Sequence, residues 1–397
     1  MGDGDGGTAG PATRAISAGR GGDWASQVAN PPVYRASTHL FASCADLRAT
    51  RADDADGRRF FYGRQGSPTQ WALEDALTEL ERGAAGTVLY PSGLAAITGA
   101  LLTMLKPGDT LLMTDNAYAP SRDFATGFLT RMRVATRFFD PLDLTGFSSL
   151  FDGTTKAVLL ESPGSLTMEV CDVPALAAVA RERGAAVLLD NTWATGIGFA
   201  ALEHGCDIAI TALTKHVGGH SDVMLGSCSA GAEWHGKLRQ TARALGQVAS
   251  PDDAALALRG LRTMPLRLER QTGSALLIAE WLSKREEVER VRYPMLPGSP
   301  DHPLWTRDFT GGCGLFSFDL RTADDAARCR FIDTLRLFGI GYSWGGYESL
   351  ALPVEPRACR SVMRGLPKRG AAIRLSIGLE DPADLITDLA RGFAAIG

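Results

Sequence analysis

Residues 187–226 read VLLDNTWATGIGFAALEHGCDIAITALTKHVGGHSDVMLG and contain two short apolar runs, each followed by a polar residue. The first run ends at Asp190, and the second, within DIAITALT, ends at Lys215. Runs of this length are typical of buried strands, and a longer segment separates them. This alternation predicts a parallel sheet, in which ligands lie beyond the carboxyl ends of the strands.

The same alternation extends outward over residues 67–250. Strands are expected at 87–90, 110–113, 156–161, 186–190 and 207–212, and helices at 94–105 and 173–184. We therefore predict an α/β fold whose large domain, residues 67–255, is a mostly parallel sheet covered by helices. A smaller C-terminal α+β domain is expected at 256–397, from an amphipathic stretch at 274–284, apolar runs at 314–320 and 371–378, and a helix at 324–338.

Residues 1–66 have a different character. Residues 1–23 contain eight glycines and hardly any large apolar side chain, which predicts a mobile tail. Residues 24–66 are rich in Pro, Arg and aromatic residues without a helical period, which predicts an extended arm. Such an arm needs another surface to pack against, and a neighbouring subunit could supply it.

Composition narrows the class of partner. The chain has 41 Lys+Arg against 45 Asp+Glu, and this near balance favours a small molecule over nucleic acid or a membrane. No apolar run reaches the ~18 residues that cross a bilayer, and no signal sequence is visible, so we expect a cytoplasmic protein. The seven cysteines form no C-x-x-C pair and are expected to be reduced, buried thiols.

Lys215 and Asp190 can share one chemical task. A lysine at the end of a buried strand is partly shielded from water, which favours the neutral amine that forms an imine with an aldehyde. A carboxylate at a nearby strand end can keep a pyridine nitrogen protonated, so that the ring accepts electrons. From the residues alone, a surface lysine and a helix-capping aspartate remain the simpler interpretation.

The stretch TKHVGGHSDVMLG, with DNTWA before it, resembles the Cys/Met-metabolism family of pyridoxal-phosphate (PLP) enzymes, and within it the cystathionine β-lyases. The resemblance runs from about residue 34 to the C-terminus and implies an aspartate aminotransferase-like fold. Further segments agree in order: FYGRQG at 61–66, PSG at 91–93, AYAPSRDF at 117–124, ESPGSLTME at 161–169, RDFTG at 307–311, YSWGGYESL at 342–350 and IRLSIGLED at 373–381.

The resemblance implies a set of PLP-binding residues. Lys215 would carry the cofactor as an imine and move the Cα proton, Asp190 would pair with the ring nitrogen, and Tyr118 would stack on the ring. The phosphate would be bound by Ser92, Gly93 and Leu94, at the start of the helix at 94–105, together with Thr214, and by Tyr62 and Arg64 of a neighbouring subunit. The family thus implies a homo-oligomer, expected to be a tetramer.

The substrate pocket is expected around Arg374. A guanidinium within an apolar run is costly to bury unless an anion meets it, and a structural Asp or Glu would serve equally well. The resemblance assigns it the substrate α-carboxylate, with Ser343 and Trp344 completing the pocket. Trp344 favours β-elimination, because relatives that act at Cγ are expected to have another residue there.

The reaction implied is the cleavage of L-cystathionine to homocysteine, pyruvate and ammonia, a step of methionine biosynthesis. Lys215 would be the base and then the acid, assisted by Tyr118 or Tyr62. Two positions depart from the family: Ala119, where several β-lyases have an acid, and Ala212, where many members have a serine. Another cysteine S-conjugate β-lyase or a cysteine desulfhydrase is therefore the nearest alternative.

Three further alternatives are compatible with parts of the sequence. A family member that performs γ-elimination or γ-replacement is one, and a non-catalytic descendant is another, although such a descendant is expected to lose Lys215, Asp190 or Arg374. A metal site is the third. His216 and His220 are four residues apart, but Gly218 and Gly219 lie between them and no H-E-x-x-H motif is present, so no metal is expected.

Overall fold

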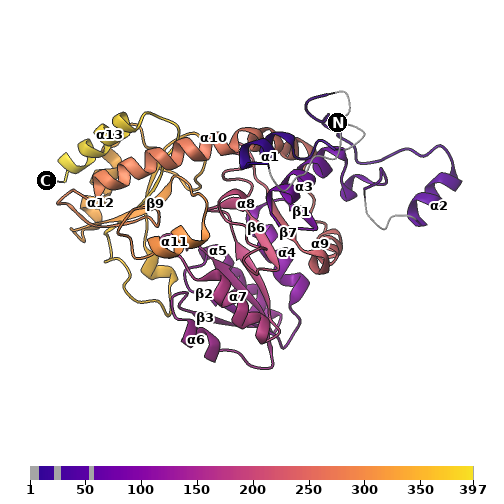
Figure 1. Cartoon of the computed structure of the whole chain (residues 1–397), viewed down its shortest axis with the longest axis horizontal. Coiled ribbons are helices and arrows are strands. Elements are labelled where there is room, and N and C mark those ends of the chain that lie inside the picture. The colour runs from indigo at the N-terminus through magenta and orange to yellow at the C-terminus, as the bar shows by residue number, and fades with distance from the viewer. Residues whose placement is uncertain (1–8, 22–27, 53–57, 397) are drawn as a thin grey trace.

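The computed structural model describes residues 9–21, 28–52 and 58–396. Its larger part is a seven-stranded sheet in the order β1-β7-β6-β5-β4-β2-β3 (Figure 1). The strands from β3 to β6 pair in parallel, and β7 is antiparallel to both β6 and β1. The strands are β1 (Gly86–Tyr90), β2 (Thr110–Thr114), β3 (Ala135–Phe139), β4 (Thr155–Glu161), β5 (Ala186–Asp190), β6 (Ile208–Thr211) and β7 (Gly226–Ala230). The predicted mostly parallel sheet is confirmed.

Both faces of this sheet are buried, because each strand sends alternate side chains into different cores. In β5, Val187 and Leu189 join one apolar cluster and Leu188 joins the other. The cluster around Leu188 is covered by α4 (Gly93–Met104) and α9 (Ala232–Ala244). The opposite cluster is covered by α3 (Pro68–Leu80) and α7 (Val173–Glu182) and continues into the C-terminal part of the chain.

The C-terminal part contains a second, four-stranded sheet, which is antiparallel throughout and has the order β10-β11-β9-β8. Its strands are β8 (Val288–Arg292), β9 (Leu315–Leu320), β10 (Leu350–Pro353) and β11 (Ala372–Ser376), and its helices include α11 (His302–Asp308), α12 (Asp325–Thr334) and α13 (Pro382–Ala394). Helix α10 (Pro251–Leu282) passes along both sheets (Figure 1). Because α10 runs across residue 255, the unit boundaries at 66 and 255 stay predictions.

Short elements connect these layers and position the site. They are α5 (Ala119–Asp123), α6 (Leu144–Ser149), α8 (Thr195–Gly198) and the turns η2 (Gly63–Gln65), η3 (Phe124–Leu129) and η4 (Pro356–Cys359). Among them, α5 and η3 follow β2 directly, and η4 follows β10. The site residues come from the end of β5, from the segments that follow β1, β2 and β6, from the loop before β10 and from β11.

The N-terminal residues depart from the prediction of a mobile tail. Residues 11–17 form helix α1 (Pro11–Ser17), with Ala15 and Ala18 fully buried. Arg262 of α10 donates hydrogen bonds of 2.8 Å to the carbonyls of both alanines. The prediction is wrong for residues 9–21, because small side chains let this helix pack closely on α3 and α10. Residues 1–8 and 22–23 lie outside the described residues.

Residues 28–66 form the arm, in so far as they are described. Helix α2 (Cys44–Ala52) stands away from both sheets (Figure 1), so the arm is not extended throughout. Several of its apolar side chains are open to solvent, with Leu40 94% and Phe60 43% exposed. That a neighbouring subunit covers these side chains stays a prediction.

Candidate active site

Two carboxyl groups mark the carboxyl ends of β4 and β5. Glu161 and Asp190 are paired in register at the last position of these parallel strands. Asp190 accepts hydrogen bonds from the backbone N–H of Thr192 at 3.1 Å and from its hydroxyl at 2.5 Å. Burial raises the pKa of Asp190, while these hydrogen bonds and Lys215 lower it, and the net direction is upward.

Lys215 follows β6 and meets a loop of the C-terminal part. Its Nζ donates a hydrogen bond of 2.7 Å to Oγ of Ser343 and lies 5.4 Å from the ring centroid of Trp344. Burial, and to a smaller extent Arg374, lower the pKa of Lys215 to about 8, against the opposing effect of Asp190. The surroundings therefore favour a neutral amine, as the sequence predicts.

Arg374 reaches the same serine from β11. Its Nη2 donates to the carbonyl of Ser343 at 2.8 Å, and its Nε is buried without a partner among the described residues. Burial outweighs the opposing effects of Tyr118 and Tyr342 and lowers the pKa of Arg374 to about 10. No carboxylate is hydrogen-bonded to the guanidinium within the described chain, so an anionic ligand would meet an unsatisfied donor.

Tyr118 lies at the start of α5, between the two carboxyl groups and Arg374. Its backbone N–H donates to Oε2 of Glu161 at 2.6 Å, while its ring is 46% exposed. Burial raises the pKa of Tyr118, as do Glu161 and Asp190, whereas Arg374 lowers it. A half-exposed ring fixed through its backbone can stack on a bound ring. Ala119 begins α5 directly after it.

The N-terminus of α4 lies against the loop before Lys215. Ser92 caps the helix, with its Oγ accepting from the N–H of Ala95 at 3.1 Å, and the N–H groups of Gly93 and Leu94 have no partner in the described chain. A Cβ at Gly93 would lie 2.6 Å from the Cβ of Ala212, so glycine is required where these segments cross. Ala212 therefore fills the space opposite the helix start.

Thr214 lies near the start of α4, but its hydroxyl is already hydrogen-bonded to the backbone of Leu225. Its Oγ1 donates to the carbonyl of Leu225 at 3.1 Å and accepts from the N–H of Leu225 at 3.0 Å. The hydroxyl would have to turn away from that carbonyl in order to donate to a phosphate. Its contribution to phosphate binding stays a prediction.

Tyr62 and Arg64 are not brought to Lys215 within one chain. Arg64 donates from Nη1 to the carbonyl of Arg243 at 2.9 Å, and its guanidinium lies 5.9 Å from the ring of Tyr62. Both residues line a separate hollow with Gln70 and Val248. This placement agrees with their predicted role in a neighbouring subunit and does not test it.

The other predicted site residues lie close together, and their chemistry fits the cofactor that the resemblance implies. Hydrogen bonds, the contact of Lys215 with the Trp344 ring and electrostatic interactions link Lys215, Asp190, Tyr118, Ser343, Trp344 and Arg374. Gly93, at the start of α4, packs against Ala212, three residues before Lys215. An amine, a ring-facing carboxylate and a helix N-terminus are the donor set that an aldehyde, a pyridine nitrogen and a phosphate require. The unpartnered Nε of Arg374 adds a site for a substrate carboxylate.

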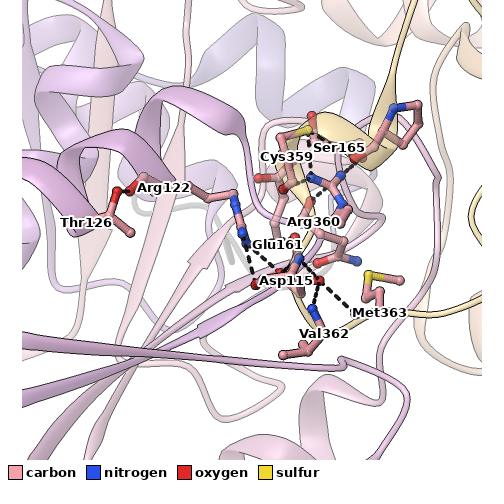
Figure 2. Close-up of polar contacts among 12 residues, drawn as sticks. Asp115, Arg122, Thr126, Glu161, Ser165, Cys359, Arg360, Val362 and Met363 are labelled. Carbon is pink, nitrogen blue, oxygen red and sulfur yellow. Dashed lines mark hydrogen bonds and ion pairs between the residues drawn. The ribbon is translucent and has the colours of Figure 1, made fainter. Parts of the chain in front are cut away.

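Glu161 and Arg360 belong to this neighbourhood but were not predicted. Glu161 stands in the ESPGSLTME segment at a strand end, and this position could have indicated it. Arg360 could not have been found, because its contacts are with residues about 200 positions away, and Figure 2 shows it beside Ser165.

Among residues 9–21, 28–52 and 58–396, no group of three or more His, Cys, Asp and Glu side chains could hold a metal ion. Nδ1 of His220 contacts the carbonyl of Gly218 at 2.8 Å, and His216 is buried against Trp344. None of the helices described has the length and apolar character needed to span a membrane.

The sequence and the fold of this chain are similar to those of known enzymes. A family model described as Cys/Met metabolism PLP-dependent enzyme matches residues 12–394. Cystathionine beta-lyase MetC of Escherichia coli is 43% identical over 389 residues, which cover 97% of this chain and 98% of that protein. An L-alanine/L-glutamate racemase of Wolbachia pipientis is 38% identical over 379 residues, or 92% of this chain and 93% of that protein. The crystal structure of metB from Corynebacterium glutamicum has a TM-score of 0.90 at 28% identity and covers 99% of this chain and 100% of that chain.

Proposed function

The chain belongs to the Cys/Met metabolism family of PLP-dependent enzymes, and from this premise we propose that it is a carbon–sulfur β-lyase. The predicted family, fold class and cofactor are confirmed, and pyridoxal phosphate is the cofactor. The proposed reaction converts L-cystathionine and water to homocysteine, pyruvate and ammonia. Cystathionine beta-lyases that are 39–43% identical over at least 91% of the chain support it.

One observation carries the proposal: Ser343 contacts both the amine of Lys215 and the guanidinium of Arg374. A substrate whose α-carboxylate is bound at Arg374 would therefore present its Cα close to Lys215. The planar fork of Arg374 suits a carboxylate, and its unpartnered Nε is available to complete the pair. This arrangement suits an amino acid as substrate.

Bound pyridoxal phosphate supplies an aldehyde carbon that reacts with amines and a ring that withdraws electrons from the substrate Cα. Asp190 would keep a proton on the ring nitrogen, and the N-terminus of α4 would bind the phosphate. Lys215, partly neutral because of its lowered pKa, would remove the proton from Cα. Tyr118 would hold the ring in place by stacking.

The carbon–sulfur step then needs a proton at sulfur. As the Cβ–S bond breaks, its electron pair stays on sulfur, and Lys215 would return the proton that it took from Cα. The thiol leaves as homocysteine, and water hydrolyses the released three-carbon enamine to pyruvate and ammonia. Atoms balance with one water consumed per cystathionine.

The purified enzyme with added PLP tests this proposal. We expect an imine absorption band in the wild type, no such band in Lys215→Ala, and pyruvate as the keto acid formed from L-cystathionine. Formation of 2-oxobutyrate would instead show γ-elimination. Pyruvate from cysteine or S-methylcysteine, but not from cystathionine, would show another β-lyase, and racemisation of L-alanine without pyruvate would show a racemase.

We also propose that active sites are completed between subunits of a homo-oligomer, a tetramer, in the cytoplasm. The exposed apolar residues of the arm, with Leu40 the most exposed, support an interface there. Tyr62 and Arg64 would then reach the phosphate of a neighbouring subunit, and methionine biosynthesis would be the context. Light scattering of the purified protein tests the subunit number, and a monomeric active enzyme would contradict this part.

A further inference from the structure

We propose, on the basis of the proposed function, that Arg360 is a positioning residue that fixes the backbone of Tyr118 and thereby holds the ring of Tyr118 over the cofactor. Arg360 lies on the loop after η4, in the C-terminal part of the chain, and touches none of the predicted site residues directly. It acts through the two segments that carry Tyr118 and Glu161. Figure 2 shows these segments together.

The loop that carries Arg360 is held by a buried carboxylate. Asp115, directly after β2, accepts the backbone N–H groups of residues 361, 362 and 363 at 2.8–2.9 Å, and the hydroxyl of Ser361 at 2.7 Å. The side chain of Asp115 is fully buried, and Nη1 of Arg122 balances its charge at 2.8 Å. Three consecutive N–H groups on one carboxylate fix the loop next to Arg360.

The guanidinium of Arg360 then joins two separate segments. Its Nη2 donates to the carbonyl of Asn116 at 3.3 Å and to the carbonyl of Ser165. Its Nη1 contacts the carbonyl and the sulfur of Cys359 at 3.1 and 3.3 Å, which sets the plane of the group. Because the guanidinium is planar and rigid, it fixes the distance between the two carbonyls.

These two carbonyls belong to the segments that position Tyr118. The N–H of Ser165 donates to the carbonyl of Asn116 at 2.9 Å, and a Cβ at Gly164 would lie 2.0 Å from Nδ2 of Asn116, so the segments are in close contact. Two residues farther along, the N–H of Tyr118 donates to Glu161 at 2.6 Å. Two hydrogen bonds thus join residues 116–118 to residues 161–165. Arg360 binds both segments at one end of this contact, and Tyr118 lies at the other end.

The charge of Arg360 supports the same contact. Burial raises the pKa of Glu161 well above its usual range, as does Asp190 beside it, whereas Arg360 lowers it. A carboxylate accepts the Tyr118 N–H more strongly than a neutral carboxyl group does. Arg360 therefore favours the form of Glu161 that holds Tyr118 in place.

The test compares Arg360→Met and Arg360→Lys with Ser361→Ala, all as PLP-loaded enzyme. Ser361→Ala is the matched control, because it removes the hydroxyl contacts with Asp115 and Arg122 from the same loop and leaves Arg360, and the backbone N–H groups that bind Asp115, unchanged. We expect Arg360→Met to reduce the visible circular dichroism per bound cofactor and to lower kcat on the order of ten- to a hundredfold, as for a misplaced catalytic group. In both measurements, Arg360→Lys should give values between those of the wild type and Arg360→Met, and Ser361→Ala should match the wild type.

A double-mutant cycle separates positioning from general stabilisation. In a Tyr118→Ala background, Arg360→Met should change kcat by less than about twofold, because the residue through which it acts is gone. An equal effect in both backgrounds, or unchanged circular dichroism in Arg360→Met, would overturn the proposal. If Arg360→Met does not fold, Arg360→Lys supplies the same two comparisons.

The outcomes also distinguish this inference from the proposed function. Circular dichroism of the bound cofactor needs no substrate, so it reports on Arg360 even if cystathionine is not cleaved. A wild-type enzyme that binds PLP but forms no pyruvate would refute the proposed reaction. If cystathionine is not cleaved, kcat in the double-mutant cycle of Arg360 and Tyr118 is measured with the substrate that the wild-type enzyme does convert.

Discussion

Nζ of Lys215 lies 2.7 Å from Oγ of Ser343, and the carbonyl of the same serine lies 2.8 Å from Nη2 of Arg374. Ser343 also has a φ of 77°, in the left-handed region that costs an L-residue about 1–2 kcal/mol. Its hydroxyl and its carbonyl must face two different cations, and this backbone conformation allows both contacts. The strain therefore lies at a residue that joins the proposed base to the proposed carboxylate-binding group.

Two substitutions of Ser343 separate the effect of its hydrogen bond to Lys215 from the effect of its positive φ. Ser343→Ala and Ser343→Gly both remove the hydroxyl that holds the free amine of Lys215, so each should lower kcat/KM about tenfold, the scale of one hydrogen bond to a charged group. Glycine tolerates the positive φ, so the Gly variant should be more stable than the Ala variant by about 1 kcal/mol. Steady-state kinetics and thermal unfolding measure the two effects. Equal stabilities, or an Ala variant with full activity, would contradict this interpretation.

Much of the large sheet could be predicted because its strands are continuous apolar runs. The runs at 87–90 and 186–190 correspond to β1 and β5 within a residue. Strand β7, with the sequence GSCSA, has no such run, and its burial depends on lying between β1 and β6. Only part of α10 was predicted, because Pro265 interrupts its pattern, and the packing of both sheets stabilises the rest.

The site was predictable where chemistry lies at a strand end and less so where it depends on contacts between distant segments. Asp190 and Lys215 each close an apolar run, and Arg374 is a charge inside one, so each can be recognised locally. The contact of Ser343 with both cations, and that of Arg360 with Ser165, join residues more than 30 and 190 positions apart. No pattern in the sequence reports such distances.

The pKa of Lys215 gives a prediction for the apoprotein. Burial first, and Arg374 second, lower this pKa to about 8, so about a tenth of the amines should be neutral at pH 7. Acetylation of Lys215, followed by peptide mass spectrometry across pH, should have a midpoint near pH 8. Asp190→Asn should move the midpoint down, because the carboxylate favours the charged amine, and Arg374→Met should move it up. A midpoint near the usual value of lysine, about 10.4, would show that the amine is not shielded.

Asp115 provides a prediction about stability. Burial raises its pKa, but the N–H groups of Met363 and Val362 and the hydroxyl of Ser361 lower it more, so the net direction is downward. A carboxyl group whose pKa is lowered by folding stabilises the fold at pH values above its pKa in the unfolded chain, about 3.9. That contribution is lost as the pH falls below this value and through the lowered pKa of the folded state. Asp115→Ala should therefore cost about 3–5 kcal/mol at pH 7, because Arg122 is left buried without its partner.

Chemical denaturation of Asp115→Ala at pH 7, next to Asp333→Ala on an exposed face of α12, measures this cost. The control should differ from the wild type by less than about 0.5 kcal/mol, as is usual for surface substitutions. The difference between wild type and Asp115→Ala should shrink as the pH is lowered toward 3. A difference that stays constant with pH would show that the charge of Asp115 is not responsible.

The last prediction concerns Arg64, which lies on the arm and away from Lys215 of its own chain. If Arg64 serves the site of a neighbouring subunit, Lys215→Ala and Arg64→Ala proteins should each be nearly inactive alone. In a mixed dimer, one site combines Lys215 of one chain with Arg64 of the other and is intact, whereas the second site carries both defects. Random reassembly of equal amounts should therefore restore about a quarter of the wild-type sites, because half of the dimers are mixed and each has one intact site.

Co-expression with two different affinity tags, and purification through both, isolates the mixed species for measurement of pyruvate formation. Arg243→Ala is a useful companion in place of Arg64→Ala: the carbonyl that Arg64 contacts at position 243 is kept, so this variant should remain active alone. If the mixed dimers of Lys215→Ala and Arg64→Ala show no recovered activity, Arg64 acts within its own chain, because two subunits that complete each other's sites cannot avoid forming one intact site. An Arg64→Ala protein that is fully active alone would show that Arg64 has no role in the site.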